Sequence, residues 1–355
     1  MDASPLLNRR NRRLPAVAVR TALRPAGWLW RSITASRNAL YDARLLPALP
    51  LSRPTLSVGN LTTGGTGKTP MVIDLVRRVR GHGHRPAVLH RGYGGGDRTS
   101  DEHLLYKACL DPEVPVVADP DRRAAATRTL AERPEITLFI LDDGFQHRKI
   151  QRDLDLVLVD ASVPLQEQRV LPAGFLREGS RGLRRADAVV LTHLEQIDDD
   201  AVPRLVRFIA ARAGDVPVMR ARHVWRHLLR CDDGTLPISA LTEARVVGAC
   251  GIGNPGAFEA MVRHHAGATA AFHTFPDHHP VNHATAQSVL DAAHRLNADT
   301  VIMTEKDWMK WRSVLPELNR HGLELLRPAL AITFDEGEED LDSLLRTRLP
   351  VHEQG

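Results

Sequence analysis

The stretch Ser57–Pro70 constrains this chain more than any other, because a short apolar run breaks there into glycines and then into Lys-Thr. Glycines let backbone N–H groups crowd around a polyphosphate, Lys68 can reach the outer phosphates, and the Thr69 hydroxyl can ligate Mg²⁺. The usual pattern has Gly at the first position of such a loop, where this chain has Thr62. A glycine-rich turn with an incidental lysine is the alternative. The order strand, loop, helix favours a phosphate-binding loop (P-loop).

Length and composition indicate a protein large enough for two domains. The chain has 355 residues, 43% of them apolar, and domain-size statistics favour two cores at this length. Its three cysteines, Cys109, Cys231 and Cys250, form no C-x-x-C pair, which indicates a reducing compartment and no thiolate metal site. The longest stretch without Asp, Glu, Lys or Arg is Pro54–Gly67, which is too short and too rich in glycine to span a bilayer as a helix.

Charge is concentrated at the N-terminal end of the chain. Residues 1–53 hold ten Arg and no Lys against Asp2 and Asp42, a local charge of +8, whereas the whole chain carries only +4. The remaining residues are therefore slightly acidic. This distribution argues against nucleic-acid binding and predicts that one end of the molecule meets an anionic surface.

Residues 1–53 are predicted to form a basic arm followed by an amphipathic helix. Helical sequence begins near Pro15, is interrupted at Pro25, and resumes over 28–46. One face of that helix carries Leu29, Ile33, Ser36, Leu40 and Ala43. A helix in a membrane interface fits this pattern, and so does a helix packed on the protein's own core. An organellar transit peptide also fits the Arg-rich, acid-poor composition.

Apolar runs that favour strands alternate with segments that favour helices from Thr55 to Leu141, and a second alternating unit begins at Arg245. Such alternation is typical of parallel sheets covered by helices. The sequence therefore predicts an α/β fold, with a P-loop NTPase-like parallel sheet flanked by helices and a second, smaller α/β domain joined by a hairpin hinge. The predicted boundaries are 1–53 for the arm and amphipathic helix, 54–222 for the P-loop domain, 223–244 for the hinge, and 245–355 for the smaller domain, whose C-terminal segment can return to the first.

Polar residues follow the predicted strands of the first domain. A buried strand ends in Asp142-Asp143, which places carboxylates near the metal of a bound nucleotide, although an Asp-Asp-Gly turn has the same sequence. The polar segment 145–148 projects from the same edge of the sheet, where ligands of such folds bind. Arg177 and Glu178 can serve phosphate and metal, or form an exposed ion pair.

The smaller domain carries the sequence F-P-D-H-H, with His278 and His279. A metal site would need a third ligand at suitable spacing, so an imidazole acting in an acid–base pair is the more attractive interpretation. The sequence does not assign a role to the segment Thr304–Asp307. The acidic run Asp335–Asp340 is predicted to be a solvated turn.

Taken together and in their order, these motifs resemble the tetraacyldisaccharide 4′-kinase family of lipid A biosynthesis. The resemblance rests on S-V-G-N-L-T-x-G-G-T-G-K-T-P, R-G-Y-G-G, D-D-G-F-Q-H, L-P-A-G-x-L-R-E, G-I-G-N-P, F-P-D-H-H and M-T-E-K-D. It extends from about residue 25 to about residue 312. Thr62 at the first position of the loop is also typical of that family.

The resemblance implies ATP- and Mg²⁺-dependent phosphorylation of the 4′-hydroxyl of a lipid A disaccharide 1-phosphate. The enzyme would act at the cytoplasmic face of the inner membrane as a peripheral or monotopic protein, with no nucleic-acid partner and no evident obligate protein partner. Three groups of site residues follow from it. The catalytic group comprises Asp101, His278 and Lys68. The nucleotide-binding group comprises Thr62, Thr63, Gly64, Gly65, Thr66, Gly67, Lys68, Thr69, Arg122, Gln146, His147 and Arg177. The metal-binding group comprises Thr69, Asp142, Asp143 and Glu178. Closure of the two domains is expected to bring Asp101 to His278.

Two departures from the family pattern stand out. The family has G-D-E-P where this chain has Ser100-Asp101-Glu102-His103, and the N-terminal arm is longer and richer in arginine than expected. The main competing function is a P-loop ATPase or GTPase switch or assembly factor without a small-molecule acceptor, and a third is a nucleotide-binding membrane scaffold without catalysis. Neither gives a role to the F-P-D-H-H loop.

Overall fold

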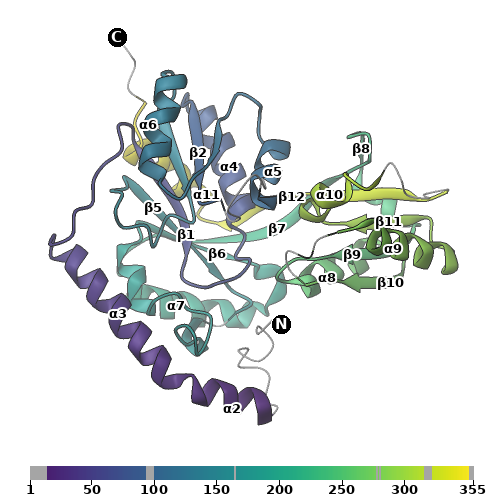
Figure 1. Ribbon diagram of the computed structural model, residues 1–355, viewed down its shortest axis with the longest axis horizontal. Helices are drawn as coiled ribbons and strands as arrows, with labels where there is room; N and C mark the ends of the chain where they lie inside the picture. The colour runs from purple at the N-terminus through teal and green to yellow at the C-terminus, as the bar shows by residue number, and fades with distance from the viewer. Residues whose placement is uncertain are drawn as a thin grey trace. The chain divides into compact units, whose positions relative to one another are not determined.

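The computed structural model describes residues 14–92, 100–163, 165–276, 279, 281–315 and 322–351 (Figure 1). The chain divides into two compact units. The P-loop unit contains residues 1–95, 109–223 and 332–355, and the second unit contains residues 96–108 and 224–331. Residues 96–108 thus cluster with the second unit, although the sequence boundaries put them in the P-loop domain. The boundaries of the arm and of the hinge stay predictions.

The P-loop unit is built on a parallel sheet in the order β7-β6-β5-β1-β4-β2-β3. Its strands are β1 (Thr55–Asn60), β2 (Pro86–His90), β3 (Val116–Ala118), β4 (Leu138–Asp142), β5 (Leu154–Asp160), β6 (Ala188–Thr192) and the first half of β7 (Val218–Leu229). Every residue of β1, β2, β4, β5 and β6 is buried. These strands are apolar on both faces because helices cover both faces of the sheet. The P-loop NTPase-like α/β fold predicted from the sequence is confirmed.

The helices of this unit are α2 (Leu14–Ala22), α3 (Arg24–Asp42), α4 (Lys68–Gly81), α6 (Arg122–Glu132), α7 (Val202–Ala213) and α11 (Glu338–Arg348), with 3₁₀ turns η1 (Leu165–Glu167), η2 (Ser180–Arg185), η3 (Leu194–Gln196) and η4 (Asp199–Ala201). Two of these helices, α3 and α11, differ from the sequence-based prediction. Pro25 lies in the first turn of α3, where a missing N–H costs nothing, so α3 begins four residues earlier than predicted. The second half of the acidic run is not a turn. Glu338, Glu339 and Asp340 form the first turn of α11, where carboxylates favour the positive end of the helix dipole.

The second unit holds another parallel sheet, in the order β10-β9-β11-β12. Its strands are β9 (Arg245–Cys250), β10 (Ala268–Thr274), β11 (Thr300–Met303) and most of β12 (Glu324–Glu336), with helices α5 (Asp101–Cys109), α8 (Pro255–His265), α9 (His283–Arg295) and α10 (Glu305–Trp311), and the 3₁₀ turn η5 (Ile238–Leu241). The predicted hairpin is formed by the end of β7 and β8 (Thr235–Leu236). Both β7 and β12 contribute residues to each unit.

Candidate active site

The P-loop lies at the carboxyl end of β1 and leads directly into α4. Gly64 and Gly67 have φ of +124° and +82°, a region that residues with a Cβ avoid. An added Cβ would meet nothing within 4 Å at Gly64 or Gly65, so this part of the loop is open. No side chain caps the N-terminus of α4 at Gly67. The first N–H groups of the helix are therefore available to an anion, as phosphate binding requires.

The loop is held in place by a neighbouring segment and by buried side chains. The Thr63 N–H donates to Phe175 O at 2.8 Å, and the Arg177 N–H donates to Leu61 O at 2.8 Å. Inside the loop, Asn60 Nδ2 donates to Thr66 Oγ1 at 2.8 Å, with both side chains buried. These bonds fix the loop on both sides while Gly64 and Gly65 stay exposed. The role of Asn60 was missed in the sequence, where it reads as the last residue of a strand.

Lys68 and Arg177 both contact the carboxylate of Asp143. Lys68 Nζ lies 3.5 Å from Asp143 Oδ1, and Arg177 Nη1 lies 2.6 Å from Oδ2. Asp143 has φ of +55°, which turns the chain sharply after β4. Burial opposes ionisation of this carboxyl, but the charges of Lys68 and Arg177 outweigh it and lower the pKa of Asp143. The carboxylate is therefore ionised at neutral pH, and two cations flank it at the mouth of the loop.

Asp142 ends β4 beside β1, where its Cα is paired with that of Val58. Its side chain is only 4% exposed, and Arg122 Nη2 donates to its backbone carbonyl at 3.2 Å. Asp142, Asp143 and the Thr69 hydroxyl supply hard oxygen donors, which is the donor set that Mg²⁺ prefers. The residues present therefore fit a magnesium ion accompanying a bound nucleotide.

Glu178 is held by three side chains. Arg185 donates to it through both terminal nitrogens, at 3.0 and 2.8 Å, and Asn38 Nδ2 donates at 2.6 Å. Gln146 Nε2 donates to Glu178 at 3.1 Å and to Asn60 O at 2.8 Å. Glu178 is thus a buried anchor rather than an exposed half of an ion pair. Arg185 lies on η2, seven residues after Glu178, and no sequence motif indicated a role for it.

His147 follows Gln146 on the same turn, and its N–H donates to Gly144 O at 2.8 Å. Burial first, and then the neighbouring charge of Arg122, lower the pKa of His147 to about 4. The imidazole is therefore neutral at pH 7. Five of the predicted site residues form one connected set at the loop: Lys68, Asp143, Arg177, Gln146 and Glu178. The Arg122–Asp142 contact is separate from this set.

Helix α3 lies against this set of residues. Trp30 Nε1 donates to Arg177 O at 3.0 Å, and Arg37 Nη2 donates to Gln146 O at 3.0 Å. Gly27 allows close approach, because a Cβ there would lie 3.1 Å from Ala173 Cβ. The N-terminal helix is therefore attached to the P-loop unit at the site itself.

The second unit presents Asp101 at the start of α5. Lys310 Nζ lies 3.3 Å from Asp101 Oδ2 and 3.9 Å from Asp307 Oδ1. Asp307 Oδ2 in turn accepts from the Gly251 N–H at 3.0 Å, and an added Cβ on Gly251 would lie 3.3 Å from Pro276 O. Asp101 is thus linked, within one unit, to the start of the F-P-D-H-H loop. The expectation that domain closure brings Asp101 to His278 stays a prediction, because His278 lies outside the described residues.

The segment Thr304–Asp307 now has a structural role. Thr304 caps α10 by accepting from the Asp307 N–H at 3.1 Å, and its hydroxyl donates to Asp307 Oδ2 at 2.6 Å. Burial raises the pKa of Asp307, against the opposing effect of its bond to Thr304. These contacts aim Asp307 at Gly251 and at Lys310.

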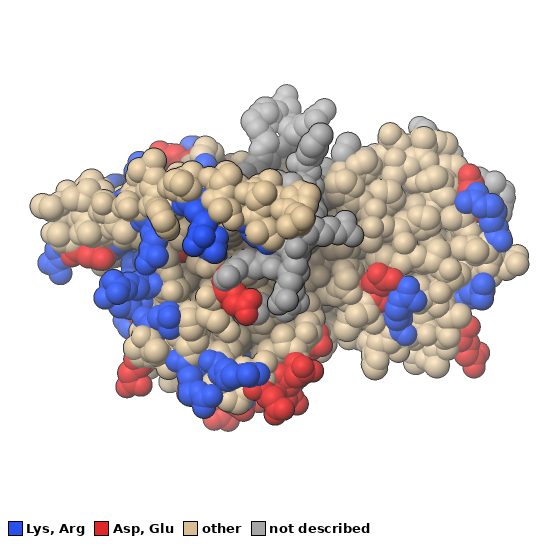
Figure 2. Space-filling model, turned by 90° about the horizontal axis from the view of Figure 1, so that it is seen from below, with Lys and Arg blue, Asp and Glu red and all other residues tan. Residues whose placement is uncertain are grey.

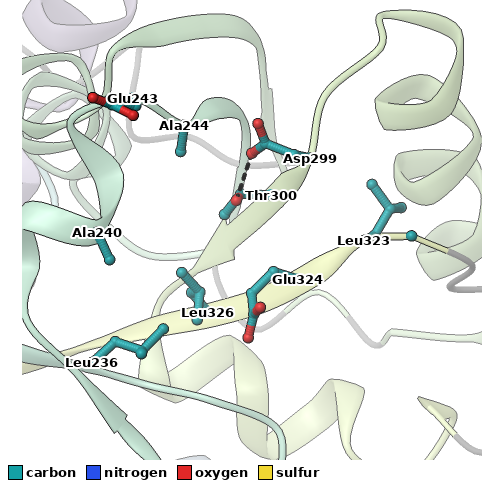
Figure 3. Close-up of a pocket in the computed structure, with 10 residues that line it drawn as sticks. Leu236, Ala240, Glu243, Ala244, Asp299, Thr300, Leu323, Glu324 and Leu326 are labelled. Carbon is teal, nitrogen blue, oxygen red and sulfur yellow. Dashed lines mark hydrogen bonds between the residues drawn. The ribbon is translucent and has the colours of Figure 1, made fainter.

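A cavity of about 580 Å³ opens elsewhere in the second unit (Figure 3). The carboxylates of Glu243, Asp299 and Glu324 line it, together with apolar side chains such as Leu326, and Thr300 donates to Asp299 at 2.7 Å. An acidic lining repels phosphate. This cavity therefore does not compete with the P-loop as the nucleotide site.

Comparisons with known proteins agree with this geometry. A family model described as tetraacyldisaccharide-1-P 4′-kinase matches residues 19–350. The chain is 34% identical over 319 residues to a tetraacyldisaccharide 4′-kinase of Anaeromyxobacter sp. (strain K), covering 84% of this chain and 83% of the relative. It is 35% identical over 355 residues to that of Chlorobium phaeovibrioides, covering 91% and 96%.

Among solved structures, a crystal structure of LpxK from Aquifex aeolicus, described as an "apo" form in complex with ATP, superposes with a TM-score of 0.72 at 28% identity, over 93% of this chain and 99% of that chain. A match of this extent covers both units of the fold. The chain therefore belongs to the tetraacyldisaccharide-1-P 4′-kinase family.

Proposed function

We propose that this chain transfers the γ-phosphate of ATP to the 4′-hydroxyl of a tetraacyldisaccharide 1-phosphate, in lipid A biosynthesis. The observation that carries the proposal is the pairing of Lys68 and Arg177 with the single carboxylate of Asp143 beside an open P-loop. Two cations on one anion leave a net positive charge where the outer phosphates of ATP would bind. Family membership supplies the acceptor.

The residues divide the reaction between two tasks. The N–H groups of the loop and the first turn of α4 bind the phosphates, and Lys68 and Arg177 exchange part of their contact with Asp143 for phosphate oxygens. Thr69, Asp142 and Asp143 would hold Mg²⁺, which supplies further neutralisation of phosphate charge when bound. Glu178, which Arg185 holds, keeps two site residues in position. Arg177 precedes it in the chain, and Gln146 donates a hydrogen bond to it.

The acceptor side of the reaction belongs to Asp101. The 4′-oxygen of the sugar forms a bond to the γ-phosphorus, the bond to the bridging oxygen of ADP breaks, and the hydroxyl proton passes to the carboxylate. Lys310 Nζ, 3.3 Å from Asp101 Oδ2, orients the Asp101 carboxylate for this transfer. The family resemblance pairs Asp101 with His278.

Purified protein incubated with γ-labelled ATP and a lipid A disaccharide 1-phosphate tests this function. We expect label in the lipid phase, lost in Lys68→Ala and Asp101→Ala and kept in Lys149→Ala, which removes an exposed lysine outside the site. Circular dichroism shows whether each variant is folded. Release of inorganic phosphate without labelled lipid would support the ATPase switch instead, and normal turnover by Lys68→Ala or Asp101→Ala would disprove that residue's role.

We also propose that α2 and α3 dock on the anionic inner-membrane surface, at its cytoplasmic face. The exposed apolar side chains of these helices are Leu14, Val17, Val19, Trp28, Leu29, Trp30, Ile33 and Leu40. Figure 2, which views the molecule from below Figure 1, shows a ridge of mostly uncharged surface with Lys and Arg side chains along one side. The described part of α3 buries only Gly27, which argues against a helix packed on the core. None of the described helices is long and apolar enough to cross a membrane.

Co-sedimentation with vesicles tests the docking. Leu29→Gln combined with Ile33→Gln is expected to reduce binding to phosphatidylglycerol vesicles, because these side chains are 64% and 52% exposed and do not support the fold. Leu330→Gln, at an exposed leucine of the second unit, is the matched control. Deleting residues 1–46 should have a larger effect. Unchanged binding of both altered proteins would rule out the docking.

A further inference from the structure

Three side chains of the P-loop unit that the nucleotide site does not use lie close together. They are His193, Glu195 and His223, whose potential ligand atoms all fall within 4.8 Å of one another. His193 and Glu195 follow β6, and His223 lies on the neighbouring strand β7. No local motif in the sequence indicates the cluster, because His223 lies 28 positions after Glu195.

The buried imidazole of His223 lacks the hydrogen bonds that buried polar groups normally make. His223 is 8% exposed, and neither of its ring nitrogens has a hydrogen-bond partner among the described residues. Its Nδ1 lies 3.8 Å from Glu195 Oε1, and its ring centroid lies 4.4 Å from that of His193. Buried, unsatisfied nitrogens facing a carboxylate call for an explanation, and a bound ion is one.

We infer that His193, Glu195 and His223 form a binding site for a divalent transition-metal ion of the zinc class. Two imidazoles and one carboxylate suit Zn²⁺, Co²⁺ or Ni²⁺ and do not suit Mg²⁺, which prefers oxygen ligands only. Tetrahedral ligands around zinc lie about 3.4 Å apart, so small side-chain rotations bring the three groups into contact with one ion. The site is distinct from the magnesium donors Asp142 and Asp143.

The surroundings of the cluster support ligation. Asp160 Oδ1 lies 3.2 Å from His193 Nδ1, an arrangement in which a carboxylate orients a metal-binding histidine. The backbone N–H of His223 donates to Glu195 Oε2 at 3.3 Å, which leaves Glu195 Oε1 toward the His223 ring. His193 and Glu195 would thus each be held by a second contact.

The cluster also contacts the P-loop. A Cβ on Gly67 would lie 2.5 Å from His223 Nε2, so one edge of the imidazole packs on the last glycine of the loop while Nδ1 faces Glu195. An ion held by Nδ1 would fix His223 against the start of α4. Metal binding should therefore stabilise the folded P-loop unit.

Titration of the metal-stripped full-length protein with Co²⁺, without nucleotide, tests the inference. We expect one ion per chain, the visible bands of tetrahedral Co²⁺, displacement by Zn²⁺, and a rise in melting temperature. Glu195→Gln, which keeps the shape of the side chain, and His193→Ala should each weaken binding at least about tenfold, and Asp160→Asn should weaken it by about 10- to 100-fold.

His264→Ala removes an exposed histidine of the consecutive pair His264-His265 in the second unit and is the matched control, which should bind as the wild type does. The site does not exist if the wild type shows no binding of Co²⁺ or Zn²⁺ at micromolar concentration. It is equally overturned if folded Glu195→Gln and His193→Ala proteins bind with wild-type affinity, since the ion then resides elsewhere.

Discussion

Replacing Glu178 by Gln separates a structural role of this residue from a metal-binding role. Gln has the same shape, so the substitution removes the charge and little packing. The Glu178 side chain is 4% exposed, and that of Arg185 is 15% exposed. Removing one partner of a buried ion pair costs about 3–5 kcal/mol, because the other charge is left without compensation.

The expected cost lies at the lower end of that range, about 3 kcal/mol. Arg185 retains some solvent, and its guanidinium stacks 4.4 Å from the ring of Phe145. Asn38 and Gln146 donate to opposite oxygens of Glu178, so the single oxygen of the new amide retains one of these two bonds. Arg185→Gln should have a similar effect. The free energy of unfolding lost in the double variant should be smaller, by about 1–3 kcal/mol, than the sum of the losses in the two single variants, since the interaction is lost only once.

Urea unfolding monitored by far-ultraviolet circular dichroism measures these free energies of unfolding, and a kinase assay at increasing Mg²⁺ accompanies it. If Glu178 acts as an anchor, both single variants lose stability and neither changes the Mg²⁺ requirement. Strictly additive losses, or a Glu178→Gln protein of wild-type stability that needs far more Mg²⁺ than Arg185→Gln does, would refute the reasoning.

Two further changes test the loop and its surroundings. Gly67→Ala should destabilise the protein by about 2–4 kcal/mol and reduce ATP binding, because a Cβ at φ +82° is strained and would meet His223. Gly64→Ala, with open space around it, should cost only about 1–2 kcal/mol. Equal losses of stability in the two variants would contradict the clash. The folded-state pKa of His147 lies below its ordinary value, so the unfolded chain binds the extra proton first and stability falls as the pH is lowered from about 6.5 to about 4. His147→Gln should flatten this part of a stability profile measured by thermal unfolding, and a profile identical to that of the wild type would show that the burial of His147 by its neighbours is not responsible.

Much of the fold could be predicted because its signals are local. Apolar runs and glycine breaks predicted the strand β1 before the P-loop and the strand β4 that ends at Asp142. The short helix α10 was missed, since the segment after Met303 is polar, and its Thr304 cap becomes evident only with Asp307 in place. The acidic run that leads into α11 was predicted to be a solvated turn because of its charge. Its last three residues instead complement the dipole of that helix.

For the site as well, the features that could be predicted are those with local signals in the sequence. The spacing of Gly67, Lys68 and Thr69 by itself determined a phosphate-binding loop, because these groups are neighbours in sequence and bind one ligand together. The sequence also placed Asp142 and Asp143 at the edge of the sheet, since parallel strands end on the same side.

Only the tertiary structure decided which distant residues become partners. The packing of the elements brings Asn38 to Glu178, Lys310 to Asp101, and His223 to His193. Each of these contacts depends on elements that are far apart in the chain, and no local pattern specifies their distance. A buried charge needs a partner, but its identity follows from the packing of the whole unit rather than from the residues beside it.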